Sequence, residues 1–476
     1  MDSKDSATIV ERLSDFLSKL TPTTAAKLVQ GLERERLCGA NGLPYDLIMS
    51  SIRPILTANA RERIGPPTPL RQFCTPFEDL LVDDYDETSR TRQIRRSSIL
   101  PVWNWLEEDL LTDTLPDITR RLAALTLGED DVARSGTLAV MHGACSAAIL
   151  SEVAAVRRDA GERRKLERRL GGEHVVDDAV EMARALSVAT FILAVREALP
   201  KKIREFDDAM AAEVGDIYEE ARHASMENGI YVPFSVMSRL DEPWQILRLA
   251  RKLAGYGNDA AVSRSGLSDL AEVFVLELED IADKLGNQRV GTVDLDEMLG
   301  EVLRFARISQ GFIHEIDIRR YSSWGHRILS ARGRLSATIA EEMSRFEQML
   351  ARALPLHLVG NYGKNGPRRP DITKAPNFDR AEKAAACLRF LTGVQPAAES
   401  IGTQSHCKTV MQEIETYLAS YEDGLIEELR RSKGAEQANG LAFLDIVVGY
   451  RETMGAGEFA RTLRRRGQVA SAARAS

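Results

Sequence analysis

Residues 270–285 read LAEVFVLELEDIADKL, and this stretch decides the fold class. Its apolar side chains recur every three or four residues, at Leu270, Phe274, Leu278, Ile281 and Leu285. Side chains at that spacing lie along one face of an α-helix, and the charged residues between them lie on the other faces. The same period runs through most of the chain, whereas the alternation typical of strands is almost absent. The sequence therefore predicts an all-α protein, a multi-helix bundle without significant sheet.

Local signals agree with this interpretation. The best candidate for a strand, residues 229–234, contains Pro233, which cannot donate a hydrogen bond to a sheet. Three segments begin with an acidic residue followed by Glu three positions later, a pattern that caps the free backbone N–H groups of a helix start. We therefore expect helices to begin at three aspartates, which are Asp178 with Glu181, Asp294 with Glu297, and Asp379 with Glu382.

The 476 residues are enough for two or more helical modules. Residues 1–128 have a higher density of Pro and shorter predicted helices, and residues 129–354 are expected to form a central bundle of long helices. Residues 355–378 are rich in Gly, Pro and basic side chains and are expected to form a flexible basic loop. Helices in residues 379–465 are expected to pack on the central bundle, and residues 466–476 are expected to fray.

Cysteine usage, the N-terminal sequence and composition indicate the bacterial cytoplasm. Five scattered cysteines without a CxxC pair are typical of free thiols in a reducing compartment. The first residues lack the basic and apolar regions of a secretory signal. The longest uncharged stretch, residues 135–151, is shorter than the ~20 residues that a membrane-spanning helix requires. Arg supplies 50 of the 63 basic residues, a bias associated with GC-rich bacterial genomes.

The net charge of −8 disfavours nucleic acid as a partner, because binding to its backbone depends on basic residues that neutralise phosphates. One basic run stands out, formed by Arg163, Arg164, Lys165, Arg168 and Arg169. On a helix, like charges in this run lie at i,i+4 and repel one another. The run predicts an acidic protein partner. The alternatives are a plain solvated face, or a nucleic acid or anionic membrane whose binding weakens steeply with salt.

Trp105 is a second candidate for a partner contact. Trp103 fits the apolar stripe of one predicted helix, together with Ile99, Leu106 and Leu110. Trp105 lies ~200° around the same helix. We expect it to be either clamped between modules or exposed for a partner.

An acidic run is the sharpest indication of metal chemistry. Asp83, Asp84 and Glu87 follow a pattern with which all-α isoprenoid synthases hold Mg²⁺ against a diphosphate. Those enzymes need a second metal-binding stretch, and after Asn258-Asp259 the ligand positions hold Val262 and Gly266 instead. A solvated acidic loop is the simpler interpretation. If the run does bind Mg²⁺, the candidate phosphate clamps are nearby arginines, namely Arg90, Arg92, Arg95 and Arg96.

His314 and Asp317 form the best polar cluster within a predicted helix. Three residues apart, they share a face on which the carboxylate could orient the imidazole as a general base. Structural ion pairing accounts for the same residues. A di-iron bundle needs two Glu-x-x-His pairs, and the sequence offers one, Glu220 with His223. We therefore expect no metal or other cofactor.

These patterns favour a helical protein-protein interaction or scaffold protein of the bacterial cytoplasm, with no catalytic site identified. The alternative is an all-helical Mg-dependent enzyme that acts on a phosphorylated or diphosphate substrate. Bound Mg²⁺ together with diphosphate would distinguish the two functions.

Overall fold

The computed structural model describes residues 68–83, 92–126, 131–255, 257–292, 294–358 and 368–472. Before residue 68 it describes single positions only, which are Leu17, Leu20, Thr24, Leu28 and Ile48. The chain divides into two compact units, residues 1–75 with 103–145 and residues 76–102 with 146–476. The predicted boundary at residue 128 lies inside the first unit, and that at residue 354 lies inside the second.

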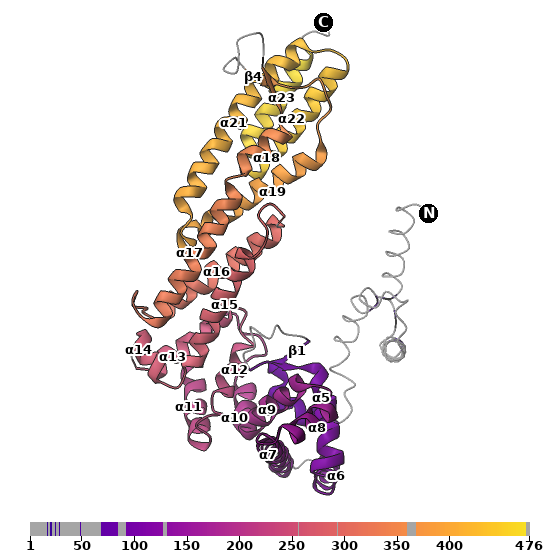
Figure 1. Ribbon diagram of the computed structural model, residues 1–476, viewed down its shortest axis with the longest axis vertical. Helices are drawn as coiled ribbons and strands as arrows, with labels where there is room; N and C mark the ends of the chain where they lie inside the picture. The colour runs from indigo at the N-terminus through magenta and orange to yellow at the C-terminus, as the bar shows by residue number, and fades with distance from the viewer. Residues whose placement is uncertain are drawn as a thin grey trace. The chain divides into compact units, whose positions relative to one another are not determined.

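Most described residues belong to α-helices, as Figure 1 shows. The helices up to residue 200 are α4 (Pro69–Cys74), α5 (Ile99–Trp105), α6 (Thr114–Thr126), α7 (Asp131–Val156), α8 (Ala160–Leu170), α9 (Glu173–Ser187) and α10 (Ala189–Ala198). Those that follow are α11 (Asp208–Ala224), α12 (Tyr231–Met237), α13 (Leu247–Leu253), α14 (Asp259–Arg264), α15 (Ser268–Gly286), α16 (Leu295–Glu315), α17 (Ser323–Met343), α18 (Phe346–Ala353), α19 (Phe378–Val394), α20 (Ala398–Ile401), α21 (Gln404–Arg431), α22 (Ala435–Thr453) and α23 (Gly457–Ala472). Short helical turns are η1 (Thr75–Leu80), η2 (Arg96–Ser98), η3 (Leu106–Leu110), η4 (Pro243–Ile246) and η6 (Gln395–Ala397).

Two short strand pairs complete the regular structure of the described residues. β1 (Leu81–Val82) pairs in parallel with β2 (Ile94–Arg95), and β3 (Leu356–Leu358) pairs antiparallel with β4 (Arg368–Pro370). Pairs of two or three residues are too small to form a sheet that buries a face. The predicted all-α, multi-helix fold is therefore confirmed. The best strand candidate, residues 229–234, forms the start of α12 and the turn before it.

The long helices of the second unit pack around an apolar core. α15 packs against α16 and α17, and α16 also packs against α19. α21, α22 and α23 lie side by side, with α18 against α21 and α19 against α22 (Figure 1). Phe346 of α18 and Phe390 of α19 meet edge to face, with 6.0 Å between the ring centroids. The helices after residue 378 thus pack on helices that precede residue 355.

The apolar stripe of α15 lies in this core. Leu270 and Leu278 are fully buried, and Phe274, Ile281 and Leu285 are at most 3% exposed. Burial of a side chain of this size contributes ~1.5 to 3 kcal/mol, an upper bound because unfolded chains already bury part of that surface. The spacing of apolar residues therefore selects the face of α15 that packs on its neighbours.

One of the three predicted aspartate caps is confirmed. The Asp294 side chain accepts hydrogen bonds from two backbone N–H groups in the first turn of α16, at 2.9 and 3.3 Å. Asn377 caps α19, which leaves Asp379 inside the first turn. Asp178 lies within α9, where its buried carboxylate accepts a hydrogen bond from Ser98 Oγ at 2.6 Å. The starts predicted at Asp178 and Asp379 are wrong, because other residues cap α19 and a tertiary contact uses Asp178.

Part of the predicted flexible loop, residues 355–378, is packed instead. β3 and β4 pair within it, and Ile372 is only 4% exposed. Asn439 of α22 donates a hydrogen bond to the Ile372 carbonyl at 3.1 Å. The tail predicted to fray is helical as far as Ala472, and Ala470 is 3% exposed. The described parts of both segments are thus packed against other parts of the chain.

Among the described residues, α7 is the helix whose length and composition are compatible with crossing a membrane. Its most apolar 18-residue window has a mean hydropathy of 1.5, and 28% of that window is buried. Length and composition alone are weak evidence, since core helices of soluble proteins share them. The described residues thus provide no clear transmembrane segment.

A glycine in α16 allows a tryptophan to lie directly on the helix backbone. Gly311 is buried, and a Cβ added there would come within 2.1 Å of the Trp244 indole. A separation that short is sterically impossible, so a larger residue displaces the ring. Gly300 of the same helix has no atom within 4 Å of its Cβ position among the described residues.

We predict that Gly311→Ala lowers the free energy of unfolding by ~1 to 3 kcal/mol, because the indole must leave its packed position. Gly300→Ala is the matched control and should raise that free energy by ~0.5 to 1 kcal/mol, because Ala is the better helix former. Urea denaturation followed by circular dichroism measures both changes. Equal effects of the two substitutions would contradict the close packing of Trp244.

The first unit contains a buried histidine. His142 of α7 is 2% exposed, and its Nε2 lies 3.0 Å from the Gln72 carbonyl oxygen. Burial disfavours the imidazolium and lowers the pKa of His142. Because a carbonyl only accepts hydrogen bonds, the neutral ring carries its proton on Nε2 and donates it to Gln72.

We predict that acidification destabilises the protein through His142. Its pKa in the folded state lies below the value of ~6.5 in the unfolded chain, so the unfolded state binds the proton more readily. Its stabilising contribution is complete above about pH 6.5 and is lost as the pH falls below that value. His142→Gln keeps an N–H donor that does not titrate. Urea denaturation at about pH 7.5 and about pH 5 should show a larger loss in the wild type than in this variant; equal losses would rule the mechanism out.

Candidate functional site

The basic run lies on α8, an exposed helix with defined ends. The Asp159 side chain accepts hydrogen bonds from two backbone N–H groups of the first turn, at 2.7 and 3.2 Å. The helix ends at Gly171, whose φ of 100° is in the left-handed region that favours glycine. Leu166 and Leu170 are buried, and α8 packs against α9. The other faces of α8 carry its charged side chains into solvent.

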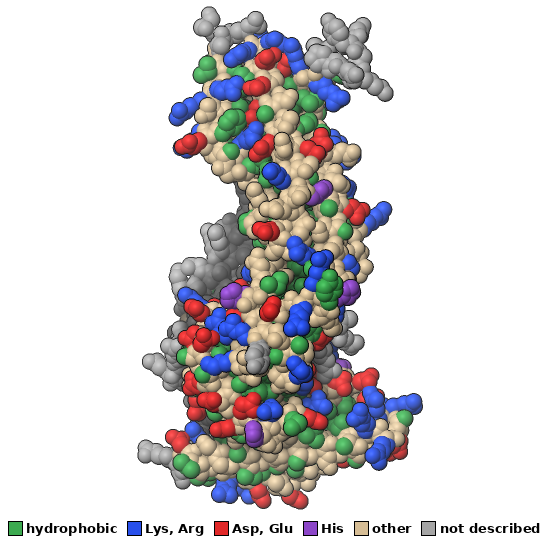
Figure 2. All heavy atoms as spheres, turned by 90° about the vertical axis from the view of Figure 1, so that its left-hand side faces the viewer, with side chains coloured by type: hydrophobic (Ala, Val, Ile, Leu, Met, Phe, Trp, Pro, Cys, Tyr) green, Lys and Arg blue, Asp and Glu red, His purple; other side chains and the backbone are tan. Residues whose placement is uncertain are grey.

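Acidic neighbours pair with part of the run. Basic and acidic side chains are interspersed over the face that Figure 2 shows. Arg163 Nε donates to Glu167 at 2.8 Å, and Arg163 also pairs with Glu173. Lys165 Nζ donates to Glu162 at 2.7 Å. Hydrogen bonds to these carboxylates raise the pKa of Arg163 and of Lys165. Both cations therefore already have a counter-ion.

Other arginines of the same surface have none. Among the described residues, no carboxylate lies within 4 Å of Arg157, Arg158, Arg164 or Arg168. Arg168 Nε donates to the Arg164 carbonyl at 3.2 Å, and the rest of its guanidinium is open to solvent. Arg169, in the last turn, is exposed as well but is not counted among these arginines, because it has an interaction of its own. We call Arg157 and Arg158, in the turn before α8, together with Arg164 and Arg168 of the helix itself, the α8 basic surface. It presents charged donors that lack acceptors.

A pocket of about 430 Å³ lies beside this surface, between α7, α8 and α9. Four valines line it together with charged residues of both signs, among them Arg163 and Glu181. The hydroxyl of the buried Tyr231 donates a hydrogen bond to the Glu181 carboxylate. Arg184 Nη1 lies 3.3 Å from the same carboxylate. Because opposite charges neutralise one another around the pocket, its lining favours no single ligand charge.

Trp105 does not contribute to an exposed surface. Its side chain is 3% exposed, against 6% for Trp103 on the face predicted to be the core. Val102 is buried as well, so α5 is covered on more than one face. A helix covered in this way buries residues of opposite faces, and angular position alone does not decide exposure. Of the two predicted alternatives for Trp105, exposure for a partner is therefore wrong.

The predicted pair of His314 and Asp317 is not formed. α16 ends at Glu315, so the two residues do not share a helical face. The Asp317 backbone N–H donates to the Gly257 carbonyl at 2.7 Å in an extended segment. His314 is 69% exposed, and its Nδ1 lies 3.4 Å from Glu315, which itself pairs with Arg248 at 2.9 Å. The termination of the helix, which the apolar pattern did not indicate, separates the two side chains.

The proposed metal ligands are only partly described. Asp84 and Glu87 lie outside the described residues. Asp83 is exposed, and its carboxylate lies 3.1 Å from Arg96 Nε. Within the described ranges, no group of three or more His, Cys, Asp or Glu side chains could hold a metal ion.

Among the proposed phosphate clamps that lie in the described residues, Arg92 and Arg96 are engaged by carboxylates. Arg90 lies outside the described residues. Arg92 pairs with Asp269 at 3.0 Å and donates to the Tyr231 hydroxyl at 3.1 Å. Its guanidinium also lies 5.0 Å from the centre of the Tyr231 ring. Arg95 is part of the short strand β2. Arg92 and Arg96 thus hold carboxylates rather than an open phosphate site.

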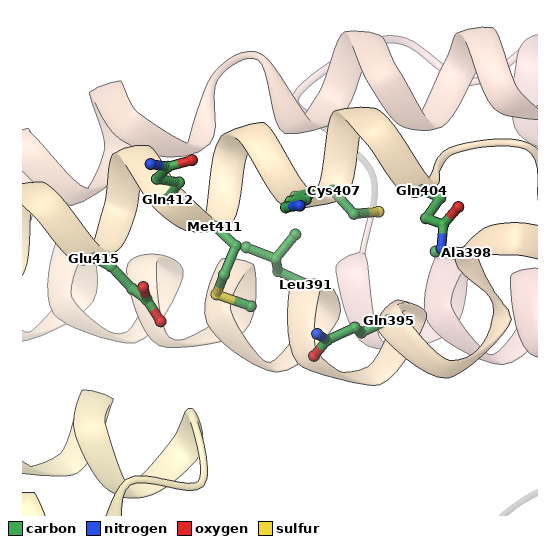
Figure 3. A pocket seen from close by; sticks show the side chains of 9 residues that line it. Leu391, Gln395, Ala398, Gln404, Cys407, Met411, Gln412 and Glu415 are labelled. Carbon is green, nitrogen blue, oxygen red and sulfur yellow. The ribbon is translucent and has the colours of Figure 1, made fainter.

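A further pocket, of about 590 Å³, lies between α19, α20 and α21 (Figure 3). Three glutamines line it, and their side-chain amides make no hydrogen bond within the described residues: Gln395, Gln404 and Gln412. Cys407 also borders it, but the side chain is 4% exposed and burial raises the pKa of its thiol. A thiol of this kind is a poor nucleophile. No sequence motif marks this pocket, because it is assembled from separate elements.

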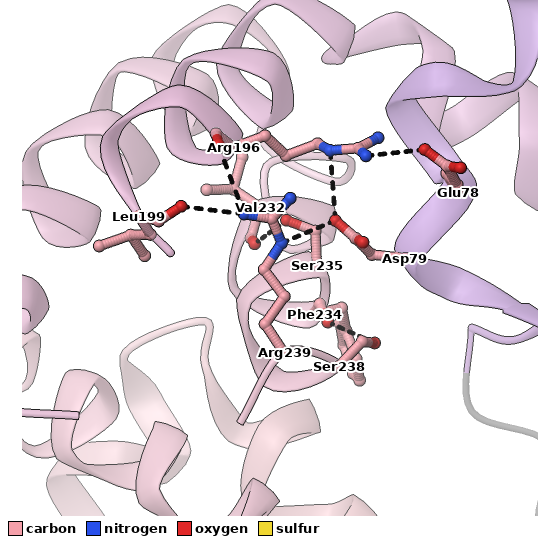
Figure 4. Close-up of polar contacts among 9 residues, drawn as sticks. All are labelled: Glu78, Asp79, Arg196, Leu199, Val232, Phe234, Ser235, Ser238 and Arg239. Atoms are coloured by element: carbon pink, nitrogen blue, oxygen red, sulfur yellow. Dashed lines mark hydrogen bonds and ion pairs between the residues drawn. The ribbon is translucent and has the colours of Figure 1, made fainter. Parts of the chain in front are cut away.

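A buried cation that the sequence did not single out connects η1 with α10 and α12 (Figure 4). The side chain of Arg239 is 4% exposed, and its Nε lies 2.9 Å from Asp79 Oδ2. Arg196 binds the same oxygen at 3.4 Å and Glu78 at 2.8 Å. Arg239 Nη1 also donates to the Leu199 carbonyl at 3.3 Å. Since its charge is satisfied internally, this cluster is structural.

No family model, curated protein or solved structure matches the chain. The arrangement of its own residues is thus what supports a function, and the α8 basic surface is one feature whose charges have no carboxylate partner within the described structure.

Proposed function

We propose that this chain is a helical interaction protein of the bacterial cytoplasm that binds an acidic protein partner through the α8 basic surface. The observation that carries the proposal is the presence of Arg157, Arg158, Arg164 and Arg168 without carboxylate neighbours among the described residues. An exposed arginine offers five N–H donors in a planar fork that matches the two oxygens of Asp or Glu.

Electrostatics supports an acidic partner. Residues 157–169 contain seven basic and three acidic side chains, in a chain whose net charge is −8. Arg164 and Arg168, at i,i+4, repel one another in the free protein by a few tenths of a kcal/mol. All these charges lie within about two Debye lengths of ~10 Å, so they act together on an approaching surface. Carboxylates supplied by a partner would relieve the repulsion and steer association.

The residues predicted to bind Mg²⁺ and phosphate give less support to the alternative, a Mg-dependent enzyme. Asp83 pairs with Arg96, and Arg92 pairs with Asp269. An anionic lipid surface remains the competing partner for the α8 basic surface, because α7 is apolar and immediately precedes α8 in sequence. These two partners are separated by the experiment below.

We predict that Arg164→Glu with Arg168→Glu changes the free energy of unfolding by less than ~1 kcal/mol, because exposed charges contribute little to folding. Binding to the partner should weaken at least ~tenfold, since two attractive charges become repulsive. Affinity capture with quantitative mass spectrometry, at low and at physiological salt, measures the loss. Arg461→Glu with Arg465→Glu is the matched control, because these exposed arginines of α23 have the same spacing and no carboxylate neighbour among the described residues.

The proposal requires an acidic protein that the wild type and the control variant recover and the α8 variant does not. Identical recovery by all three proteins would make α8 a plain solvated face. Sedimentation with phosphatidylserine vesicles, abolished by the α8 substitutions alone, would assign the surface to a lipid instead. An unfolded α8 variant would show that Arg164 and Arg168 are internal ion-pair partners.

A further inference from the structure

A second concentration of cations occurs in a pocket far along the chain from α8. The pocket has a volume of about 340 Å³ and is formed where α16, α18 and α19 begin and α17 ends. Arg345, Arg352, Arg380 and Lys383 line it, and the one acidic residue in its lining is Glu342. Small-molecule sites have volumes of ~300 to 1,000 Å³, so the pocket is large enough for a small ligand.

Glu342 offsets one of the four positive charges in this lining, and its carboxylate is engaged within the protein. Its side chain is 5% exposed and accepts a hydrogen bond from the Gly291 backbone N–H at 2.5 Å. It also lies 3.8 Å from Arg345 Nη1. Among the described residues, Arg352, Arg380 and Lys383 have no carboxylate within 4 Å. The pocket therefore keeps a formal excess of three positive charges.

The backbone at Gly291 is shaped to admit the Arg345 guanidinium. Gly291 has a φ of 80°, and a Cβ added there would lie 1.5 Å from Arg345 Nη1. That nitrogen is buried and donates no hydrogen bond within the described residues. Glu342, at 3.8 Å, is too far away to accept one. A buried cationic donor without an acceptor is costly, and a bound anion would satisfy it.

The position of two of these cations on α19 is also unfavourable without a ligand. Arg380 lies in the first turn of α19 and Lys383 in the second, at the end where the helix dipole is positive. Anions stabilise such a helix start and cations oppose it, and Asp379 in the same turn offsets one of the two cations. Arg352 has no more than a long contact with Gln348, at 3.4 Å. The buried Nη1 of Arg345, the net charge of the pocket and the helix polarity thus point to an anionic ligand at the same place.

We propose that this pocket binds a small phosphate-bearing anion, with Arg345, Arg352, Arg380 and Lys383 as its ligands. Phosphate is favoured over a single carboxylate because it presents several oxygens and up to two charges to cations that converge from different helices. Arginine forks bind such oxygens in pairs, and lysine adds a point charge. This site does not depend on the α8 basic surface, and it lies apart in sequence from the acidic run at residues 83–87.

The test is titration calorimetry of the full chain with inorganic pyrophosphate at low salt. Wild-type protein should bind, and Arg352→Gln with Arg380→Gln should weaken binding at least ~tenfold, or ~1.4 kcal/mol. Arg461→Gln with Arg465→Gln removes the same charge from α23 and should change affinity less than ~threefold. Lys383→Gln serves as a second, milder variant and should weaken binding several-fold without altering the circular dichroism spectrum.

Three results would overturn the proposal. They are no binding of pyrophosphate by the wild type, equal weakening in the pocket and control variants, and succinate binding as tightly as pyrophosphate. The α8 variant Arg164→Glu with Arg168→Glu should still bind pyrophosphate, which keeps this test independent of the proposed function. Vesicles of phosphatidylcholine with phosphatidic acid distinguish the source of the phosphate. Sedimentation with them that Arg352→Gln with Arg380→Gln abolishes assigns a lipid headgroup, and its absence assigns a soluble molecule.

Discussion

The packing of α15 against α16 and α17 is the constraint on which the arrangement of the second unit depends. The apolar stripe of α15 is buried there, and at its rim Arg327 of α17 binds Glu279 through two hydrogen bonds at 2.9 and 2.6 Å. This contact raises the pKa of Arg327 and lowers that of Glu279. A partly exposed ion pair contributes ~0 to 1 kcal/mol, less than one buried leucine at ~1.5 to 3 kcal/mol. Burial therefore supplies most of the stabilisation, and the ion pair orients α17 on α15.

Charged side chains form contacts at or near both ends of α16, the helix that packs against α15. At its C-terminal end, the buried Glu315 is held by Arg248 at 2.9 Å and by Arg251 at 3.1 Å. Near its N-terminal end, Gly291 and Glu342 position the guanidinium of Arg345. Two arginines reach the one carboxylate of Glu315, whose Oε2 makes no hydrogen bond among the described residues, and the buried Arg345 Nη1 makes none either. Arg345 also lines a pocket of about 340 Å³ with three further cations, which gives that end of the helix room for a ligand.

The same reasoning distinguishes the basic surfaces of the molecule. Some arginines that are candidates for a site have a carboxylate partner within the protein. They are Arg92, Arg96 and Arg239. Arg164 on α8 and Arg352 in the pocket have none within the described residues. A cation that remains unpaired in a chain with an excess of acidic residues has a charge available for a partner.

The sequence by itself determined the features that depend on neighbours a few residues away. The period of apolar residues identified α15 and the all-α class, and Asp294 marked a helix start, because helical faces and caps are set by local geometry. It also located the basic run that α8 exposes. Trp105 was placed correctly on its helix, but its burial depends on what covers that face.

Only the tertiary structure decided which distant residues meet. The basic pocket beside Arg345 combines Gly291, Arg345 and Arg380 from different elements, and no spacing along the chain encodes their proximity. The pairing of Asp178 with Ser98, and the separation of His314 from Asp317 by the end of α16, were likewise set by contacts between elements. The physical reason is that a local pattern fixes the face on which a side chain lies, whereas its partner, burial and free charge depend on the element packed against that face.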